Sequence, residues 1–364
     1  MSILAPAQTP SPADAVALEQ QGKLAEAAQT WRAVVQRNPR DAAAFASLGL
    51  VLSREEKYGE AVPAYQKAVA LNPKLPGVQL NLGLAEFKQG RFRAAIAPLR
   101  AALAADPRSM QAQTLLGLSY YGAKRFEEAI TQLELAAKAS PDNTELHQVL
   151  AESCLSAKKY SCALDEFRQI LEKDPNSAAA HILAGEALDG LSRTPEAIVE
   201  FQAAATVSPR EPNVHFGLGY LYWKMRQYDE ASTEFQSELA NDPNHAQALA
   251  YLGDIEMKRN NPKKALPLLR KAVEQRNDLR IAYLDMGAIL AQQNQHQEAL
   301  AALQRAEKLD PAQPDVHLRL GRLYQAMGDK AAAQKEFAKL RELHQKADDD
   351  IASKMSGSPS SLQH

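Results

Sequence analysis

The chain has 364 residues, a length that exceeds one compact core and predicts either several domains or a repeat array. Its 42 basic and 44 acidic residues are mixed along the sequence and leave a formal net charge of −2, which argues against a nucleic-acid partner. Aromatic residues make up 6% of the chain, and Ala, Leu, Gln, Glu and Lys dominate, so the composition favours an all-α protein.

The N-terminal segment, residues 1–10, is expected to be flexible. Met1 to Pro12 is small and Pro-rich, like the start of a mature exported domain whose leader has been removed. No apolar run approaches the ~18 residues that a membrane span requires. We therefore expect a soluble protein without a membrane span, either cytoplasmic or, if a leader has been removed, periplasmic. The first helix is expected to begin with Ser11 as its N-cap and Pro12 in its first turn.

From Gln8 to Ala347 the same residue types recur every 34 residues without an insertion, which gives ten repeats. The eighth and twentieth positions are always small, as expected where two helices of a hairpin approach closely and leave no room for a larger side chain. The eighth positions are Ala15, Gly49, Gly83, Gly117, Ala151, Gly185, Gly219, Gly253, Gly287 and Gly321. The twentieth positions are Ala27, Ala61, Ala95, Ala129, Ala163, Ala197, Ala231, Ala265, Ala299 and Ala333.

A bulky residue stands at the twenty-fourth position of each repeat and is expected to fill the space between neighbouring hairpins. These residues are Trp31, Tyr65, Leu99, Leu133, Phe167, Phe201, Phe235, Leu269, Leu303 and Phe337. Proline occupies the thirty-second position in eight repeats, and Asn277 and Gln345 replace it in the other two. Because proline cannot continue a helix, it should end the second helix of each hairpin.

This pattern of small residue, alanine, bulky residue and proline resembles the tetratricopeptide repeat family. The resemblance covers ten tandem repeats and implies an all-α, right-handed superhelical solenoid of antiparallel helix hairpins, with the first helices lining a concave groove. We expect residues 11–347 to form this single solenoid. Residues 348–364 should add a C-terminal helix extension and a disordered tail after Met355.

No constellation in the sequence indicates catalysis, a cofactor or a metal. The sequence contains no Gly-rich phosphate loop and no paired-cysteine metal motif. Its glycines are accounted for by helix packing or by turns such as Gly22, Gly59 and Gly90. We therefore expect no enzyme activity, no cofactor and no metal.

Four histidines, His147, His181, His215 and His317, share the fourth position of their repeats. A ladder of this kind suggests a shared metal or a pH effect. Neighbouring first helices lie about 8–10 Å apart, however, whereas the ligands of one zinc converge to about 2 Å from the ion. Ordinary packing or a mild effect of pH is therefore the favoured interpretation.

The two cysteines occupy positions eleven and nineteen of the fifth repeat, on opposite helices of one hairpin. Cys154 and Cys162 could therefore face each other and form a disulfide. Position nineteen points outward in such hairpins, which favours two free thiols. Whether the pair is bridged is left open.

The family geometry implies that positions two, five, six, nine, twelve and thirteen of each first helix face the groove. Aromatic residues and Met at these positions concentrate in repeats four to eight, beside several carboxylates. This pattern is typical of anchors for a peptide with hydrophobic and basic residues. The predicted partner-binding groove contains Tyr121, Glu152, Glu186, Asp189, Phe216, Tyr220, Trp223, Tyr251, Asp254 and Met257.

The sequence thus predicts a non-catalytic scaffold that binds a peptide or protein segment in its concave groove, and the uniform Ala- and Gln-rich repeats suggest a bacterial source. Two alternatives stay open. One is a periplasmic assembly or secretion accessory protein, and the other is a non-catalytic partner subunit of a separate enzyme. The sequence identifies neither the partner nor the oligomeric state.

Overall fold

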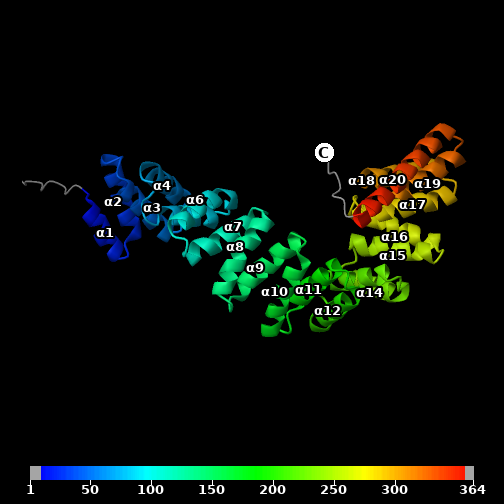
Figure 1. Cartoon of the computed structure of the whole chain (residues 1–364), viewed down its shortest axis with the longest axis horizontal. Helices are drawn as coiled ribbons and strands as arrows, with labels where there is room; N and C mark the ends of the chain where they lie inside the picture. Colours follow the sequence, from blue (N-terminus) through cyan, green and yellow to red (C-terminus); the bar gives the residue numbers. More distant parts are fainter. Residues whose placement is uncertain (1–9, 357–364) are drawn as a thin grey trace, which may run out of the picture. The chain divides into compact units, whose positions relative to one another are not determined.

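A computed structural model describes residues 10–356, and within this range the chain forms twenty α-helices and no strand. The helices form antiparallel hairpins in chain order (Figure 1), which confirms the predicted all-α repeat fold. The first helices of the hairpins are α1 (Pro12–Gln20), α3 (Ala42–Arg54), α5 (Val78–Lys88), α7 (Met110–Gly122), α9 (Thr144–Ser156), α11 (Ala178–Gly190), α13 (Val214–Lys224), α15 (Ala246–Lys258), α17 (Arg280–Gln292) and α19 (Pro314–Ala326). The second helices are α2 (Leu24–Arg37), α4 (Tyr58–Leu71), α6 (Phe92–Ala105), α8 (Phe126–Ala139), α10 (Tyr160–Lys173), α12 (Thr194–Val207), α14 (Tyr228–Asn241), α16 (Pro262–Gln275), α18 (His296–Leu309) and α20 (Lys330–Ser356).

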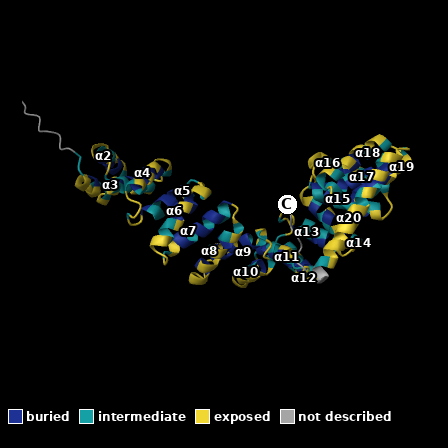
Figure 2. Ribbon diagram, turned by 45° about the horizontal axis from the view of Figure 1, so that its top comes forward, coloured by how far each residue is buried: buried dark blue, intermediate teal, exposed yellow. Residues whose placement is uncertain are grey.

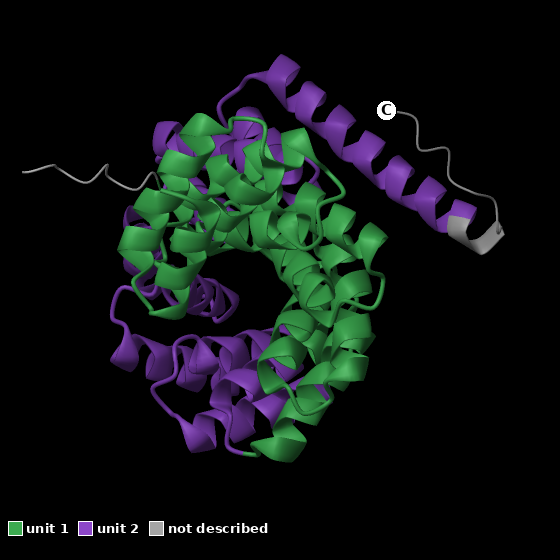
Figure 3. Ribbon diagram, turned by 90° about the vertical axis from the view of Figure 1, so that its left-hand side faces the viewer, with its two compact units in different colours: residues 1–175, 186–193 green, residues 176–185, 194–364 purple. Residues whose placement is uncertain are grey.

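The chain divides into two compact units, coloured separately in Figure 3. Unit 1 contains residues 1–175 and 186–193, and unit 2 contains residues 176–185 and 194–364. Helix α20 continues past residue 347 to Ser356. The predicted tail after this helix and the predicted N-terminal segment up to residue 9 lie outside the described residues.

Each first helix ends in the same tight turn. The residue at position fifteen has a positive φ in all ten repeats, and the next backbone N–H donates to the carbonyl five residues before it. This hydrogen bond is characteristic of the Schellman motif, which satisfies the last carbonyls of a helix. Gly22 and Gly90 occupy this position, as the sequence predicted. The prediction of a turn at Gly59 was wrong, because Gly59 is the second residue of α4 and Glu56 makes the turn.

In the eight repeats with proline at position thirty-two, the second helix ends two residues before the proline, and the residue between them is its C-cap. In α4, α6 and α14 this C-cap residue is extended, as expected where the proline ring excludes the helical conformation of its predecessor. The side chains of Asn72, Asp106, Asp242 and Asp310 then accept a hydrogen bond from the backbone N–H two residues further on. The sequence asparagine or aspartate followed by proline therefore ends one helix and forms the turn into the next.

Two first helices begin later than the 34-residue period implies. Helices α5 and α13 start at Val78 and Val214, two residues after a proline, because Gly77 and Asn213 adopt positive φ values of 74° and 66°. Helix α19, in contrast, has Pro314 as its first residue. Glycine and asparagine tolerate the left-handed conformation, which makes the extra turn possible.

The core of each hairpin is built on the small residue at position eight. A Cβ atom on Gly219 would lie 2.7 Å from the ring of Phe235, the bulky residue of the same hairpin. The bulky residue was predicted to fill the space between hairpins, but it first packs over the glycine of its own hairpin. Phe201 does both, since it contacts Gly185 of its own hairpin and Gly217 of the next. Figure 2 shows the buried residues on the helix faces that meet.

Candidate partner-binding surface

The ten residues of the predicted groove are divided between the two units. Tyr121, Glu152, Glu186 and Asp189 belong to unit 1. The other six belong to unit 2 and come from α13 and α15. That all ten form one surface remains a prediction, and each set is described within its own unit.

In unit 1, Tyr121 of α7 and Glu152 of α9 form a direct pair. The Tyr121 hydroxyl donates to Glu152 Oε2 at 2.5 Å, and Gln148 Nε2 donates to the other carboxylate oxygen at 3.0 Å. The bond to Glu152, with burial, raises the pKa of Tyr121 to about 12. Glu186 is exposed and Asp189 is partly exposed.

In unit 2, the predicted aromatic residues form one cluster of half-buried rings. The ring centroids of Trp223 and Tyr251 lie 4.9 Å apart, and those of Tyr220 and Tyr251 lie 5.6 Å apart. Phe216 stacks on Tyr220 and contacts Tyr251. Met257 lies half-buried on the same helix as Tyr251. The structure therefore brings the aromatic residues of α13 and α15 together.

The carboxylate of Asp254 is buried and fully engaged within the protein. Trp223 Nε1 donates to Asp254 Oδ2 at 2.6 Å, and Lys258 Nζ lies 3.2 Å from Asp254 Oδ1. The pairs Trp223–Asp254 and Tyr121–Glu152 both join position twelve of one repeat to position nine of the next, 31 residues later. The sequence predicts that the two carboxylates face a basic partner, whereas in the structure both are hydrogen-bonded within the protein.

A cavity of about 350 Å³ opens beside this pair. Its lining residues come from α13, α15, α17 and α19 and are Trp223, Asp254, Met257, Lys258, Arg280, Ile281, Leu284, Asp285, Asp315 and Arg319. Asp285 stands at an inward-facing position six but is not among the residues predicted for the groove. Burial, and next the charge of Asp254, raise the pKa of Asp285 to about 7. We refer to this space as the Asp285 cavity.

The four histidines of position four each pair with a glutamate of their own hairpin, 19 residues later. The distances from His Nδ1 to the Glu Oε2 atom are 2.5 Å for His147, 2.6 Å for His181, and 2.7 Å for both His215 and His317. In His147, His215 and His317 the other ring nitrogen faces a proline carbonyl six residues earlier. A carbonyl and a carboxylate both accept hydrogen bonds, so each of these three rings lies between two acceptors.

We expect the buried pair of His317 and Glu336 to depend on both partners. Replacing either one by leucine should lower the free energy of unfolding by about 2 kcal/mol, because the remaining polar group loses its hydrogen bond in a buried place. The double leucine variant should regain most of this loss, since repeat eight has Leu249 and Leu268 at the same two positions. Urea unfolding of the four proteins checks this, and additive losses would show that the two residues do not act as a pair.

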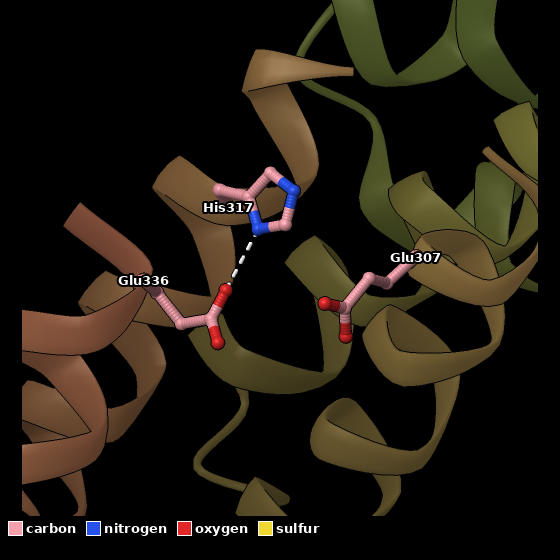
Figure 4. Close-up of side chains that lie close together, drawn as sticks. All are labelled: Glu307, His317 and Glu336. Atoms are coloured by element: carbon pink, nitrogen blue, oxygen red, sulfur yellow. Dashed lines mark hydrogen bonds and ion pairs between the residues drawn. The ribbon is translucent and has the colours of Figure 1, made fainter. Parts of the chain in front are cut away.

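Glu307 joins this pair in a cluster whose carboxylate and imidazole atoms lie within 4.8 Å of one another (Figure 4). Three such ligands are compatible with a metal ion. However, Lys339 Nζ lies 2.7 Å from Glu307 and 3.4 Å from Glu336, and both nitrogens of His317 face acceptors of the protein. The Lys339 ammonium already supplies the positive charge that the two carboxylates require, so we interpret the cluster as an ion-pair network.

The structure joins Cys154 and Cys162 by a disulfide bond, whereas the sequence had favoured two free thiols. Their Cα atoms lie 5.8 Å apart, a separation that a disulfide readily spans. Cys154 is fully buried and Cys162 is partly exposed. Positions eleven and nineteen thus face each other across the hairpin, and position nineteen does not point away from it.

Antiparallel helix hairpins with a glycine or alanine under a bulky residue define a helical-repeat scaffold. A tetratricopeptide repeat model matches residues 13–76, 80–144 and 216–280, and further models of this repeat match residues 120–187, 287–328 and 315–347. The chain belongs to the tetratricopeptide repeat family, whose members serve as protein-interaction scaffolds. Between residues 10 and 356, no helix combines the length and the apolar character that crossing a membrane requires.

Solved structures of other tetratricopeptide repeat proteins align with about half of the chain. YrrB, described as a TPR protein with an unusual peptide-binding site, is 23% identical and aligns over 49% of this chain and 91% of its own, with a TM-score of 0.40. A MamA structure labelled MSR-1 is 27% identical and aligns over 45% of this chain and 95% of its own, with a TM-score of 0.41. MamA of Desulfovibrio magneticus RS-1 is 19% identical and aligns over 46% of this chain and 95% of its own, with a TM-score of 0.42. No curated protein matches the chain.

Proposed function

We propose that this chain is a non-catalytic scaffold and that the surface of α13 and α15 binds a peptide or protein segment. The observation that carries the proposal is the cluster of Phe216, Tyr220, Trp223 and Tyr251, whose rings are half-buried and lie next to a cavity. Rigid aromatic side chains supply large contact areas at a low entropic cost, and they are enriched among residues that dominate binding energies.

The cluster is firmly supported from below. The rings of Phe216, Trp223 and Tyr251 pack against a buried core around Phe235. The bond from Trp223 to Asp254 fixes the orientation of the indole. A surface held in this way loses little freedom when a partner binds, which favours affinity.

The lining of the cavity favours binding. No serine, threonine, cysteine, histidine or tyrosine is among the residues that line the Asp285 cavity. The lining offers apolar side chains, carboxyls and cations, which suit the recognition of a peptide with hydrophobic and charged residues. We keep the sequence-based expectation that the partner segment contains basic residues.

Truncating the aromatic cluster should weaken partner binding. We expect Tyr220→Ala or Trp223→Ala to reduce the free energy of binding by about 2 kcal/mol, because each removes a large contact area from the centre of the surface. Once a partner has been isolated by affinity purification and identified by mass spectrometry, titration calorimetry with the purified partner measures the effect. Circular dichroism establishes that each variant remains folded.

Glu128→Ala and Glu196→Ala, on the second helices α8 and α12, serve as controls and should bind as the unchanged protein does. If the aromatic variants are folded and bind normally while the second-helix variants do not bind, the partner uses the opposite face and this assignment is wrong.

A further inference from the structure

Asp285 is a carboxyl group that the protein buries and satisfies only in part. It is 5% exposed, and its Oδ2 atom has no hydrogen-bond partner. A buried oxygen of this kind carries a desolvation cost that a donor would relieve. Since Asp285 lines the cavity and its two oxygens exchange by rotation of the carboxyl group, a donor that enters the cavity can reach it.

The groups around Asp285 include both carboxylates and cations. On α15, Asp254 is already satisfied by Trp223 and Lys258. On α17, the Nε atom of Arg280 lies 4.0 Å from Oδ2 of Asp310. On α19, Asp315 and Arg319 stand one helical turn apart, and the charges of Arg319 and Lys258 both favour the ionised form of Asp285. Asp285 therefore has cations near it, but its Oδ2 atom has no hydrogen-bond donor.

We propose that Asp285 binds a single basic side chain, lysine or arginine, of the partner segment that the aromatic cluster holds. This inference rests on the proposed function and adds the identity of one contact. The cavity of about 350 Å³ has room for such a side chain, and the indole of Trp223 forms part of its wall. An aromatic face beside a carboxylate attracts a cation through both groups.

Binding of a basic side chain at this place must compete with a proton. The pKa of Asp285 is about 7, so the group is only partly ionised at neutral pH. The basic side chain requires the ionised carboxylate, and its arrival therefore releases a proton. Below pH 7 we expect the affinity to fall by up to about tenfold for each pH unit.

A library of random peptides displayed on phage provides the probe. Peptides selected on the full chain are synthesised, and each basic residue is replaced in turn by norleucine, which keeps the aliphatic stem and removes the charge. Binding is measured with the unchanged protein, with Asp285→Asn and with Glu274→Gln. The last variant is a control, because Glu274 is an exposed carboxyl on α16 that does not line the cavity.

One norleucine replacement should reduce affinity by about tenfold in the unchanged protein and in Glu274→Gln, as expected for the loss of a charge-assisted hydrogen bond. The same replacement should have little effect, at most about twofold, in Asp285→Asn. For the unchanged protein, calorimetry in two buffers of different ionisation enthalpy should also show proton release near pH 7.

Two outcomes overturn this inference. If every norleucine replacement costs the same in Asp285→Asn as in the unchanged protein while Trp223→Ala still abolishes binding, the peptide uses the surface but not this carboxyl. If the selected peptides depend on acidic residues instead, the cavity binds anions. Binding that is insensitive to Trp223→Ala and Tyr220→Ala would contradict the proposed function itself.

Discussion

Replacing Gly185 by leucine should lower the free energy of unfolding by about 3 kcal/mol or more, because the sixth hairpin has no space for a side chain at this position. A Cβ atom there would lie 2.7 Å from the ring of Phe201 and 3.3 Å from the backbone carbonyl of Ala197. The same ring also packs against Gly217, where a Cβ would lie 2.2 Å from it. Ala197→Phe should have a similar effect, since Ala197 is fully buried.

The control for this prediction is Asp348→Ala, which changes an exposed residue near the end of α20 and should leave stability almost unchanged. Thermal unfolding followed by circular dichroism compares the three variants with the unchanged protein. Equal melting temperatures in all of them would mean that positions eight and twenty do not form the close contact of the hairpin.

Replacing Asp285 by asparagine should stabilise the protein at neutral and alkaline pH, by an amount on the order of 2–4 kcal/mol. The pKa of Asp285 rises from an ordinary value of 3.8 to about 7 in the folded state, because burial and the charge of Asp254 disfavour ionisation. As pH rises from about 4 to about 7, the unfolded chain loses this proton and the folded chain keeps it, so folding becomes less favourable. Asparagine is neutral at every pH and avoids this loss.

The gain should therefore be absent near pH 4, grow as pH rises, and become constant above the folded-state pKa of about 7. Urea unfolding of both proteins across this pH range measures it. Asp315→Asn, which changes an exposed carboxyl of the same cavity, should show no comparable gain. A difference between Asp285→Asn and the unchanged protein that stays constant with pH would show that Asp285 is ionised throughout.

The repeat architecture could be predicted from the sequence because it depends on contacts between fixed positions. The small residue at position eight and the bulky residue at position twenty-four recur in every repeat, and the structure places them against each other. The late starts of α5 and α13 were missed because they depend on a single residue after proline. Gly77 and Asn213 accept a positive φ there, whereas Asp315, at the same place in its repeat, continues the helix.

The candidate site was predicted less completely. The aromatic residues of unit 2 were selected from their inward-facing positions, and they do lie together. The state of the carboxylates could not be deduced in the same way, because it depends on side chains from different repeats. Asp254 is satisfied by Trp223, 31 residues earlier, and Asp285 is affected by Asp254, also 31 residues earlier. A search for polar pairs at this separation would have found the first of these contacts.

The short range of the contacts has a consequence for how the chain acquires its structure. Within each unit the helices contact their neighbours in sequence and the corresponding helices one repeat away, and the side-chain hydrogen bonds described here join residues at most 32 positions apart. Closing such short loops costs little chain entropy. Each hairpin can therefore become ordered on the surface of the one before it while the rest of the polypeptide is still being synthesised, and the ribosome need not release the whole chain before folding begins.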